Sequence, residues 1–315
     1  MAVGCFRLPS GGASLIVDFS VDDATPDTNQ TVTFTDLTVG ATQWLWDFGD
    51  GNLSTLQNPT HEYKTTGTFT VTLCASIGSN AGKEVKTNFI TVSLEAEVTT
   101  NLIASYNAGN VINDGSGNAS EWTENVNAYN ATQGTLINRP LIVTNDLNGF
   151  TTLQFDGSND QLVNTNVLFA TTTSTVYMVF RRGRIHTSNE AMHSGANAGV
   201  ANARLIYNPA NDVSYFPRNQ TLVRGISYGN NVNKWLIIAV VFDGANSSVK
   251  FMQSAPAPVG NIGSTATFGI VIGASVGGAW FQGKIAEEKI YDVAHNAATQ
   301  TQVIQRLQAK FNLYD

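Results

Sequence analysis

The chain has 315 residues, a formal net charge of −7, and charged side chains at only 13% of its positions. This length is too great for one β-sandwich and fits two domains. The net negative charge and the lack of a basic run argue against nucleic acid as a partner, because phosphate backbones are bound by clustered Lys and Arg. No stretch approaches the roughly 18 apolar residues of a membrane span, so membrane insertion is not expected.

Residues 1–13 are expected to form an N-terminal attachment arm. They contain Pro9, Gly11 and Gly12 and show no hydrophobic periodicity, which is typical of a segment that becomes ordered only against a partner. They also lack the basic start and unbroken apolar stretch of a signal peptide. The only two cysteines are Cys5, in this arm, and Cys74, in an expected strand. Their spacing predicts two free thiols and no disulfide framework.

Residues 14–94 have the pattern of an antiparallel β-sandwich. Hydrophobic and polar residues alternate within 14–21, 30–36, 67–76 and 88–93. This period of two is typical of strands that place one face on a core. Short strands separated by turn-forming stretches at this spacing indicate a sandwich of antiparallel sheets.

The most specific part of this region is WLWDFGDG at 44–51, followed by NPTHEY at 58–63 and GTFTV at 67–71. These segments resemble the PKD domain family, whose hallmarks are a WDFGDG turn, a P-x-H-x-Y segment and a G-x-Y/F-x-V strand. The resemblance covers residues 15–94 and implies an immunoglobulin-like fold. The residues that carry it are Trp46, Asp47, Gly49, Asp50, Gly51, His61 and Tyr63.

The chemistry of this motif is that of a tight turn. Gly49 and Gly51 permit the positive backbone dihedrals that such a turn requires. The short carboxylates of Asp47 and Asp50 can accept hydrogen bonds from neighbouring backbone amides, with a bound Ca²⁺ as the alternative. His61 is interpreted as a packed residue and not as a metal ligand.

Residues 95–100 form an expected linker, after which a second set of sequence blocks begins. In chain order these are WTENVNAYNAT at 122–132, LQFDGSND at 153–160, TVYMVF at 175–180, WLIIAVVFDG at 235–244 and FQGKIAEEKIYD at 281–292. Together they resemble LamG-like, concanavalin A-like domains, and the resemblance spans 101–315. It implies a jelly-roll sandwich. Residues 184–230, where ligand-facing loops are expected, match no pattern of that family, so ligand specificity cannot be transferred.

A helix is expected at 296–312. Asn296 suits the N-cap position, and Val303, Ile304, Leu307 and Phe311 fall on one stripe at helical spacing. The predicted fold class is therefore all-β, with an immunoglobulin-like sandwich followed by a concanavalin A-like jelly roll that ends in a short helix.

Two segments match catalytic signatures only in part. GASVG at 273–277 has the G-x-S-x-G pattern, but its flanks predict strand, loop and strand where a nucleophile elbow needs a strand, a turn and a helix. GAWFQGKI at 278–285 has phosphate-loop spacing, but Ile285 stands where Ser or Thr would bind Mg²⁺. Neither segment predicts an active site.

A glycosidase carboxylate pair is not expected either. Glu287 and Glu288 are sequence neighbours, so strand alternation sends them to opposite faces, one solvated and one satisfied by a local hydrogen bond. His186, His193 and His295 lack the spacing of a metal site. No catalytic residue is assigned, no cofactor is required, and the protein is not expected to be an enzyme.

Two kinds of binding residue are suggested. Aromatic side chains in expected loops can stack on sugar rings, although most aromatics of a sandwich lie in its core. Oxygen-bearing side chains in two Gly-rich turns suit Ca²⁺ better than a softer metal, with turn formation as the alternative. The candidate sugar contacts are Trp122, Tyr215, Phe216 and Trp280, and the candidate calcium ligands are Asp114, Asn118, Asp156 and Asp160.

Two adhesive-type sandwiches, an attachment-like arm and no export signal favour a non-catalytic structural protein displayed on a phage virion or phage-like particle. Capsid decoration, a head fibre and a tail-associated position all fit this hypothesis. The arm and first domain would contact other particle proteins, while the second domain binds host glycans or stabilises the particle. The alternatives are a secreted or cell-surface bacterial adhesin or carbohydrate-binding module, and an accessory module of a polysaccharide-degrading enzyme. A homo-oligomer is compatible with each.

Overall fold

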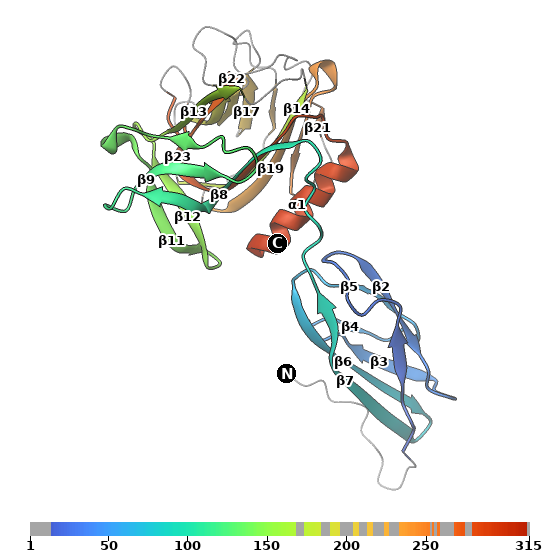
Figure 1. Cartoon of the computed structure of the whole chain (residues 1–315). Helices are drawn as coiled ribbons and strands as arrows, with labels where there is room; N and C mark the ends of the chain where they lie inside the picture. Colours follow the sequence, from blue (N-terminus) through green and yellow to red (C-terminus); the bar gives the residue numbers. More distant parts are fainter. Residues whose placement is uncertain are drawn as a thin grey trace. The chain divides into compact units, whose positions relative to one another are not determined.

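The computed structural model describes residues 14–167, 173–183, 190–195, 204–207, 213–216, 224–226, 233–252, 254, 257–258, 268–274 and 279–313. These residues form β-strands, two short 3₁₀ turns and one α-helix, which confirms the all-β class (Figure 1). The chain divides into two compact units, one ending at Glu97 and the other beginning at Val98. This boundary lies within the residues expected to form the linker.

The first unit is a sandwich of two antiparallel sheets, with strand orders β1-β2-β5 and β4-β3-β6-β7 (Figure 1). This is the expected immunoglobulin-like arrangement. The strands are β1 (Phe19–Val21), β2 (Thr31–Asp36), β3 (Gln43–Asp47), β4 (Leu53–Ser54), β5 (Thr60–Glu62), β6 (Gly67–Ile77) and β7 (Asn80–Val92).

The aromatic residues of the WDFGDG and HEY segments form the core of this sandwich. Trp46 is fully buried, and its ring packs edge-on against Phe19 with centroids 5.2 Å apart. The Tyr63 hydroxyl, also buried, donates a hydrogen bond to the Phe48 carbonyl oxygen at 3.1 Å. The motif therefore ties two segments of the chain together through both apolar packing and a buried hydrogen bond.

The turn after β3 is built as its residue types suggest. The Gly49 amide donates to Asp47 Oδ1 at 3.0 Å, and the Asn52 amide donates to Asp50 Oδ1 at 3.0 Å. Gly49 has a φ of 84°, and a Cβ at this position would lie 2.5 Å from the Thr70 carbonyl oxygen. Glycine is therefore needed here both for its backbone conformation and for space.

His61 is packed inside this motif. Its Nε2 lies 2.8 Å from Asp50 Oδ2, and its ring stacks on Phe48 with centroids 4.1 Å apart. Burial opposes the ionisation of Asp50, but hydrogen bonds from His61 and Asn52 outweigh it and hold the pKa of the carboxyl below its usual value. His61 and Asp50 thus serve as partners for one another.

Cys74 requires a correction. It lies buried on β6 and is disulfide-bonded, so the prediction of a free thiol at this position is wrong. Cys5 lies outside the described residues. The prediction failed because a disulfide depends on the distance between two Cα atoms in space, which sequence separation does not limit.

The strands described in the second unit, 16 in number, hydrogen-bond into one curled sheet (Figure 1). Its main path runs β18-β17-β16-β15-β22-β13-β10-β9-β8-β23-β14-β19-β20-β21, and β12 joins β11 to β23. The strands are β8 (Leu102–Asn113), β9 (Ala119–Glu124), β10 (Ala131–Thr132), β11 (Leu141–Leu147), β12 (Phe150–Asp156), β13 (Leu162–Val167), β14 (Ser174–Arg182), β15 (Glu190–Gly195), β16 (Arg204–Tyr207), β17 (Val213–Phe216), β18 (Arg224–Ile226), β19 (Trp235–Phe242), β20 (Ser248–Phe251), β21 (Ala257–Pro258), β22 (Phe268–Ile272) and β23 (Gln282–Tyr291).

Strand β23 lies at the centre of this sheet, paired with β12, β14 and β8. Its pairing with β14 contains a register shift between Val179 and Phe180. Such a bulge adds one residue to a strand and reverses the alternation of its side chains beyond that point. Ile285 and Ile290 therefore both lie in the core, although simple alternation would send them to opposite faces.

Glu287 and Glu288 are 2% and 0% exposed, so the prediction that one of them is solvated is wrong. Glu287 forms an ion pair with Lys289 at 3.0 Å and a second, shorter one with Lys310 of the C-terminal helix. Asn107 also donates to its Oε2 at 2.8 Å. Strand alternation does not predict the burial of Glu287, because Lys310 of the helix is 23 residues further along the chain and reaches Glu287 only in the folded structure.

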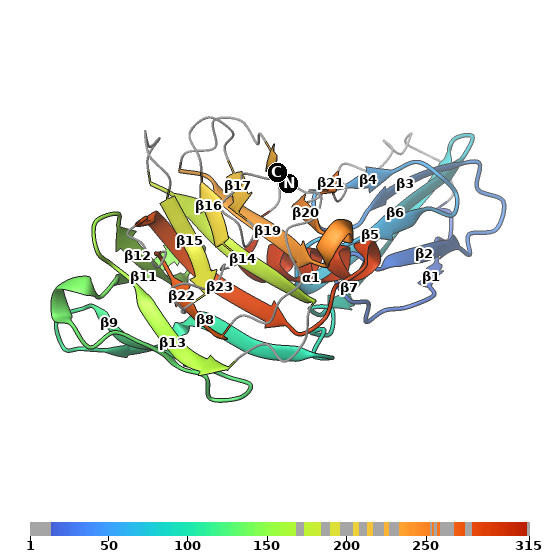
Figure 2. The ribbon, with the colours of Figure 1, turned by 90° about the horizontal axis from the view of Figure 1, so that it is seen from above.

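The C-terminal helix α1 (Ala297–Phe311) confirms the prediction for 296–312. Asn296 caps it by accepting a hydrogen bond from the Thr299 amide at 2.9 Å. The predicted stripe is buried, and the helix lies against β19 (Figure 2). Phe311 packs edge-on against Phe150 of β12, with ring centroids 4.9 Å apart. In the described part of the chain, no helix combines the length and apolar character needed to cross a membrane.

Candidate ligand-binding site

The aromatic residues predicted to contact sugars occupy different environments. Trp122 on β9 is fully buried, and its ring lies 5.6 Å from that of Tyr106, so the prediction that it is exposed to a ligand is wrong. It belongs to a strand, where alternation turns it into the core. Trp280 is half-buried. Tyr215 and Phe216 lie on β17, and their side chains are outside the described residues.

The first predicted calcium turn is closed by its own hydrogen bonds. Asp114 Oδ1 accepts from the Ser116 and Asn118 amides at 2.8 and 3.2 Å, and Oδ2 lies 3.2 Å from Arg139 Nη1. The Ser116 amide, aided by Asn118 and Arg139, holds the pKa of Asp114 below its usual value against the effect of desolvation. The carboxylate of Asp114 therefore stabilises the turn through these hydrogen bonds and the ion pair.

The second predicted calcium turn follows β12. Asp156 Oδ1 accepts from the Ser158 and Asn159 amides at 2.7 and 3.3 Å, and Asp160 Oδ2 accepts from the Asp156 amide at 2.8 Å. Burial, with a contribution from the Asp156 charge, raises the pKa of Asp160 to about 6. Within the described residues, no group of three or more His, Cys, Asp or Glu gathers as a metal site. Calcium binding stays a prediction.

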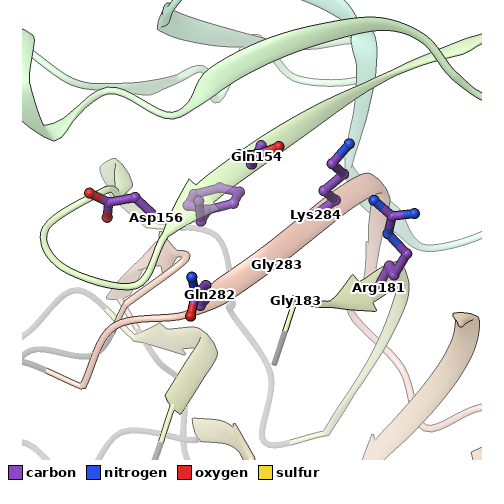
Figure 3. A pocket seen from close by; sticks show the side chains of 8 residues that line it. Gln154, Asp156, Arg181, Gly183, Gln282, Gly283 and Lys284 are labelled. Atoms are coloured by element: carbon purple, nitrogen blue, oxygen red, sulfur yellow. The ribbon is translucent and has the colours of Figure 1, made fainter. Parts of the chain in front are cut away.

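A pocket of about 330 Å³ opens over β12, β23 and β14 (Figure 3). Ligand sites commonly have volumes of about 300–1,000 Å³. Residues two apart on a strand share a face, so one face of these strands supplies the polar lining, while the Phe155 side chain is buried in the core. The lining residues are Gln154, Phe155, Asp156, Arg181, Gly183, Gln282, Gly283 and Lys284.

The register aligns four side chains in one row across four adjacent strands. Gln154 is opposite Lys284, Lys284 is opposite Arg181, and Arg181 is opposite Trp235 of β19. Directly opposed side chains on neighbouring strands have Cβ atoms about 4.5–5.5 Å apart. An amide, an ammonium, a guanidinium and an indole therefore stand side by side. We call these four residues the polar row.

The charge of Lys284 is already compensated. Its Nζ lies 2.7 Å from Asp146 Oδ1, and the Thr152 hydroxyl donates to Asp146 Oδ2 at 2.8 Å. Burial opposes the ionisation of Asp146, but the hydrogen bonds from Lys284 and Thr152 and the charge of Arg181 outweigh it and keep its pKa below the usual value. Asp146 and Lys284 thus form a half-buried ion pair beside the pocket.

Arg181 is held differently. Its guanidinium carbon lies 5.5 Å from the centre of the Trp235 ring, a cation–π contact. Among the described residues no carboxylate forms an ion pair with it. Figure 3 shows Arg181 and Lys284 at one end of the pocket and Asp156 at the other. The pocket therefore has a cationic end, with guanidinium donors available, and an acidic end.

None of the polar-row residues was singled out from the sequence. Arg181 directly follows the TVYMVF segment at 175–180, and Lys284 lies within the FQGKIAEEKIYD segment at 281–292. Their meeting depends on the register between strands about a hundred residues apart in the chain, which the side-chain pattern of a single strand does not specify.

Comparison with known proteins bears mainly on the first unit. Residues 16–92 match the family model described as PKD domain, which confirms the resemblance in that unit. The match does not reach the second unit, where the LamG-like resemblance stays a prediction. No curated protein matches the chain.

Three solved structures are among those to which this chain is similar. Trypanosoma rangeli sialidase in complex with sialic acid is 10% identical, with a TM-score of 0.51, and the match covers 96% of this chain and 54% of that chain. Domain 4 of AbnA, a GH43 extracellular arabinanase from Geobacillus stearothermophilus, in complex with arabinotriose, is 15% identical, with a TM-score of 0.48. That match covers 64% of this chain and 98% of the AbnA domain. The PKD1 domain from Vibrio cholerae metalloprotease PrtV is 23% identical, with a TM-score of 0.22. That match covers 26% of this chain and 99% of the PKD1 domain. The likeness to the sialidase, of which this chain spans about half the length, shows a shared fold alone.

Proposed function

We propose that this protein is a non-catalytic binding and display protein whose second unit holds a glycan in the pocket over β12, β23 and β14. The observation that carries this proposal is the polar row beside an open pocket of ligand size. Amide, guanidinium and ammonium groups offer several hydrogen-bond donors in a fixed order, which suits a ligand covered with hydroxyl oxygens.

The interactions of the carboxylates near the pocket support glycan binding without hydrolysis. A glycosidase needs two carboxyl groups about 5–9.5 Å apart, one of them able to exchange a proton with the substrate. Asp146 is paired with Lys284, and Asp156 accepts two amides of its own turn. Asp146 is therefore held by an ion pair and Asp156 by the amides of its turn, and neither is arranged as a proton donor.

The proposed setting is an exposed surface. A disulfide at Cys74 favours an oxidising environment, which is the condition outside most cells. In this proposal the first unit and the N-terminal arm attach the protein to a virion or phage-like particle, and the second unit faces its ligand. Attachment to a bacterial cell surface, as an adhesin, is the alternative. None of the three solved structures named above bears on this choice.

Glycan binding is tested with the full chain on an array of neutral and acidic glycans, using a variant that fills the pocket. A Cβ on Gly183 would meet only Gln282, at 3.4 Å or more, so Gly183→Leu places a side chain at the pocket without a backbone clash. The matched control is Gly134→Leu in the same unit, where a Cβ has nothing within 4 Å.

We expect wild-type protein and the Gly134→Leu control to retain the same glycans, and Gly183→Leu to lose at least about tenfold in affinity. Retention of no glycan, or equal retention by both variants, would contradict the proposal. The setting is tested by electron microscopy of native particles and cell envelopes with antibodies against residues 98–313. Regular labelling of a capsid or tail supports the virion, and labelling confined to envelopes supports the adhesin.

A further inference from the structure

We infer that the ligand of this pocket is an acidic glycan, bound through a sugar carboxylate on Arg181. This inference rests on the proposed function and adds the chemical class of the ligand. It starts from a feature that does not help the fold: Arg181 and Lys284 are like charges directly opposite one another on adjacent strands. Such a pair destabilises a sheet unless something compensates it.

Only half of that compensation is present in the described residues. Asp146 lies 2.7 Å from Lys284 and neutralises it. Arg181 has the Trp235 ring beneath it, which holds a guanidinium by its face and leaves the N–H groups at its edge free to donate. The cationic end of the pocket therefore has one positive charge in excess, and the half-buried Arg181 that supplies it is oriented by an aromatic ring.

The geometry of the guanidinium selects among anions. Its parallel N–H groups match the two oxygens of a planar carboxylate and form two charge-assisted hydrogen bonds. One net positive charge also suits a monoanion better than a phosphate dianion. Lys284 and Gln154, next in the row, can donate to hydroxyl or ring oxygens beside that carboxylate.

The opposite end of the pocket fits the rest of a sugar. Asp156 is exposed there, so this carboxyl group disfavours a second acidic group and can accept hydrogen bonds from hydroxyls. A cationic end and an acidic end together match a residue with one carboxylate and several hydroxyls, as in a uronic acid. A densely sulfated chain would meet repulsion at Asp156.

The test compares uronate polysaccharides with their carboxyl-reduced forms, which differ only by conversion of each carboxylate to a neutral alcohol. Binding of the full chain to galacturonan, alginate, hyaluronan and their reduced forms is measured by titration calorimetry, with a sulfated polysaccharide as a further ligand. Arg181→Gln removes the proposed contact. Lys234→Gln removes one exposed positive charge near the start of β19, outside the pocket lining, and controls for long-range charge.

We expect at least one uronate polysaccharide to bind at least about tenfold more tightly than its reduced form, and affinity to fall as salt screens the charges. Arg181→Gln is expected to abolish that preference, while Lys234→Gln keeps it. Equal binding of acid and reduced forms, or tighter binding of the sulfated chain, overturns the carboxylate assignment but leaves glycan binding standing if Gly183→Leu still blocks it. If the wider array shows no glycan bound at all, the proposed function itself fails.

Discussion

The buried carboxylate of Glu287 provides the most decisive stability prediction. It joins central strand β23 to helix α1, because it is paired with Lys289 at 3.0 Å on its own strand and with Lys310 on the helix. Glu287→Gln keeps the size of the side chain and removes its charge. Lys289, whose side chain is only 5% exposed, would then lose its ion pair with Glu287.

The size of the effect follows from burial. Removing one partner of a buried ion pair costs about 3–5 kcal/mol, because the remaining charge stays desolvated. Lys310 is 25% exposed and can turn toward water, and Lys289 keeps a hydrogen bond to Ser105, so we expect about 3 kcal/mol, at the lower end. The control is Glu62→Gln, since Glu62 pairs with Lys64 on the surface and its loss should cost less than about 1 kcal/mol.

The pH dependence has a definite sign. Burial opposes ionisation of Glu287, but Lys289 and Lys310 outweigh it and lower the pKa of the carboxyl. A lowered pKa contributes stability above the unfolded value of about 4.3, and that contribution is lost as pH falls through the folded pKa. The difference between wild type and Glu287→Gln should therefore be full at pH 7 and shrink below about pH 4.

The assay is hydrogen exchange of the full chain in increasing urea, followed on peptides from 282–291 and 297–311. For changes in the second unit, peptides from 16–92 serve as the internal reference, because the first unit should be unaffected. For changes in the first unit, such as Glu62→Gln, the two sets of peptides exchange roles. A loss below about 1 kcal/mol at pH 7, or a loss of the same size at pH 3, would refute the idea that Glu287 acts as a buried, charged anchor.

Three further predictions use the same readout. Gly283→Ala should destabilise the second unit by about 1–3 kcal/mol, since its Cβ would lie 2.3 Å from a backbone oxygen of β14; an unchanged midpoint would show that the strands can separate at no cost. Tyr63→Phe should cost the first unit about 1–2 kcal/mol by removing the buried donor to the Phe48 carbonyl, and a neutral result would mean that another donor replaces it. Asn296→Ala should cost about 1 kcal/mol through loss of the N-cap, with Asn296→Ser restoring most of it; equal losses would reject capping as the cause.

The sequence predicted well wherever a local pattern carries the information. The period of two around Val71 and Leu73, and the helical spacing of Val303, Ile304 and Leu307, each correspond to buried faces in the structure. The Trp46 motif was recognisable because its turn residues are contiguous. In each case the physical cause, alternation or capping, acts within about ten residues of chain.

The candidate site was not predictable in the same way. Arg181, Lys284 and Trp235 meet because three strands pair in one register, and that register includes a bulge that no alternation pattern reveals. Trp122 is predicted to lie in an exposed loop, yet it lies in a short strand with its ring in the core. The pairing of strands that are distant in the chain therefore determines both the position of Arg181 beside Lys284 and the burial of Trp122.

The most direct test of the central claim is a crystal structure of the full chain with an acidic oligosaccharide chosen from the array. We predict a sugar in the pocket over β12, β23 and β14, with its carboxylate within hydrogen-bonding distance of the Arg181 guanidinium and its hydroxyls toward Asp156. A sugar bound elsewhere on the sandwich, with this pocket empty, would contradict the account.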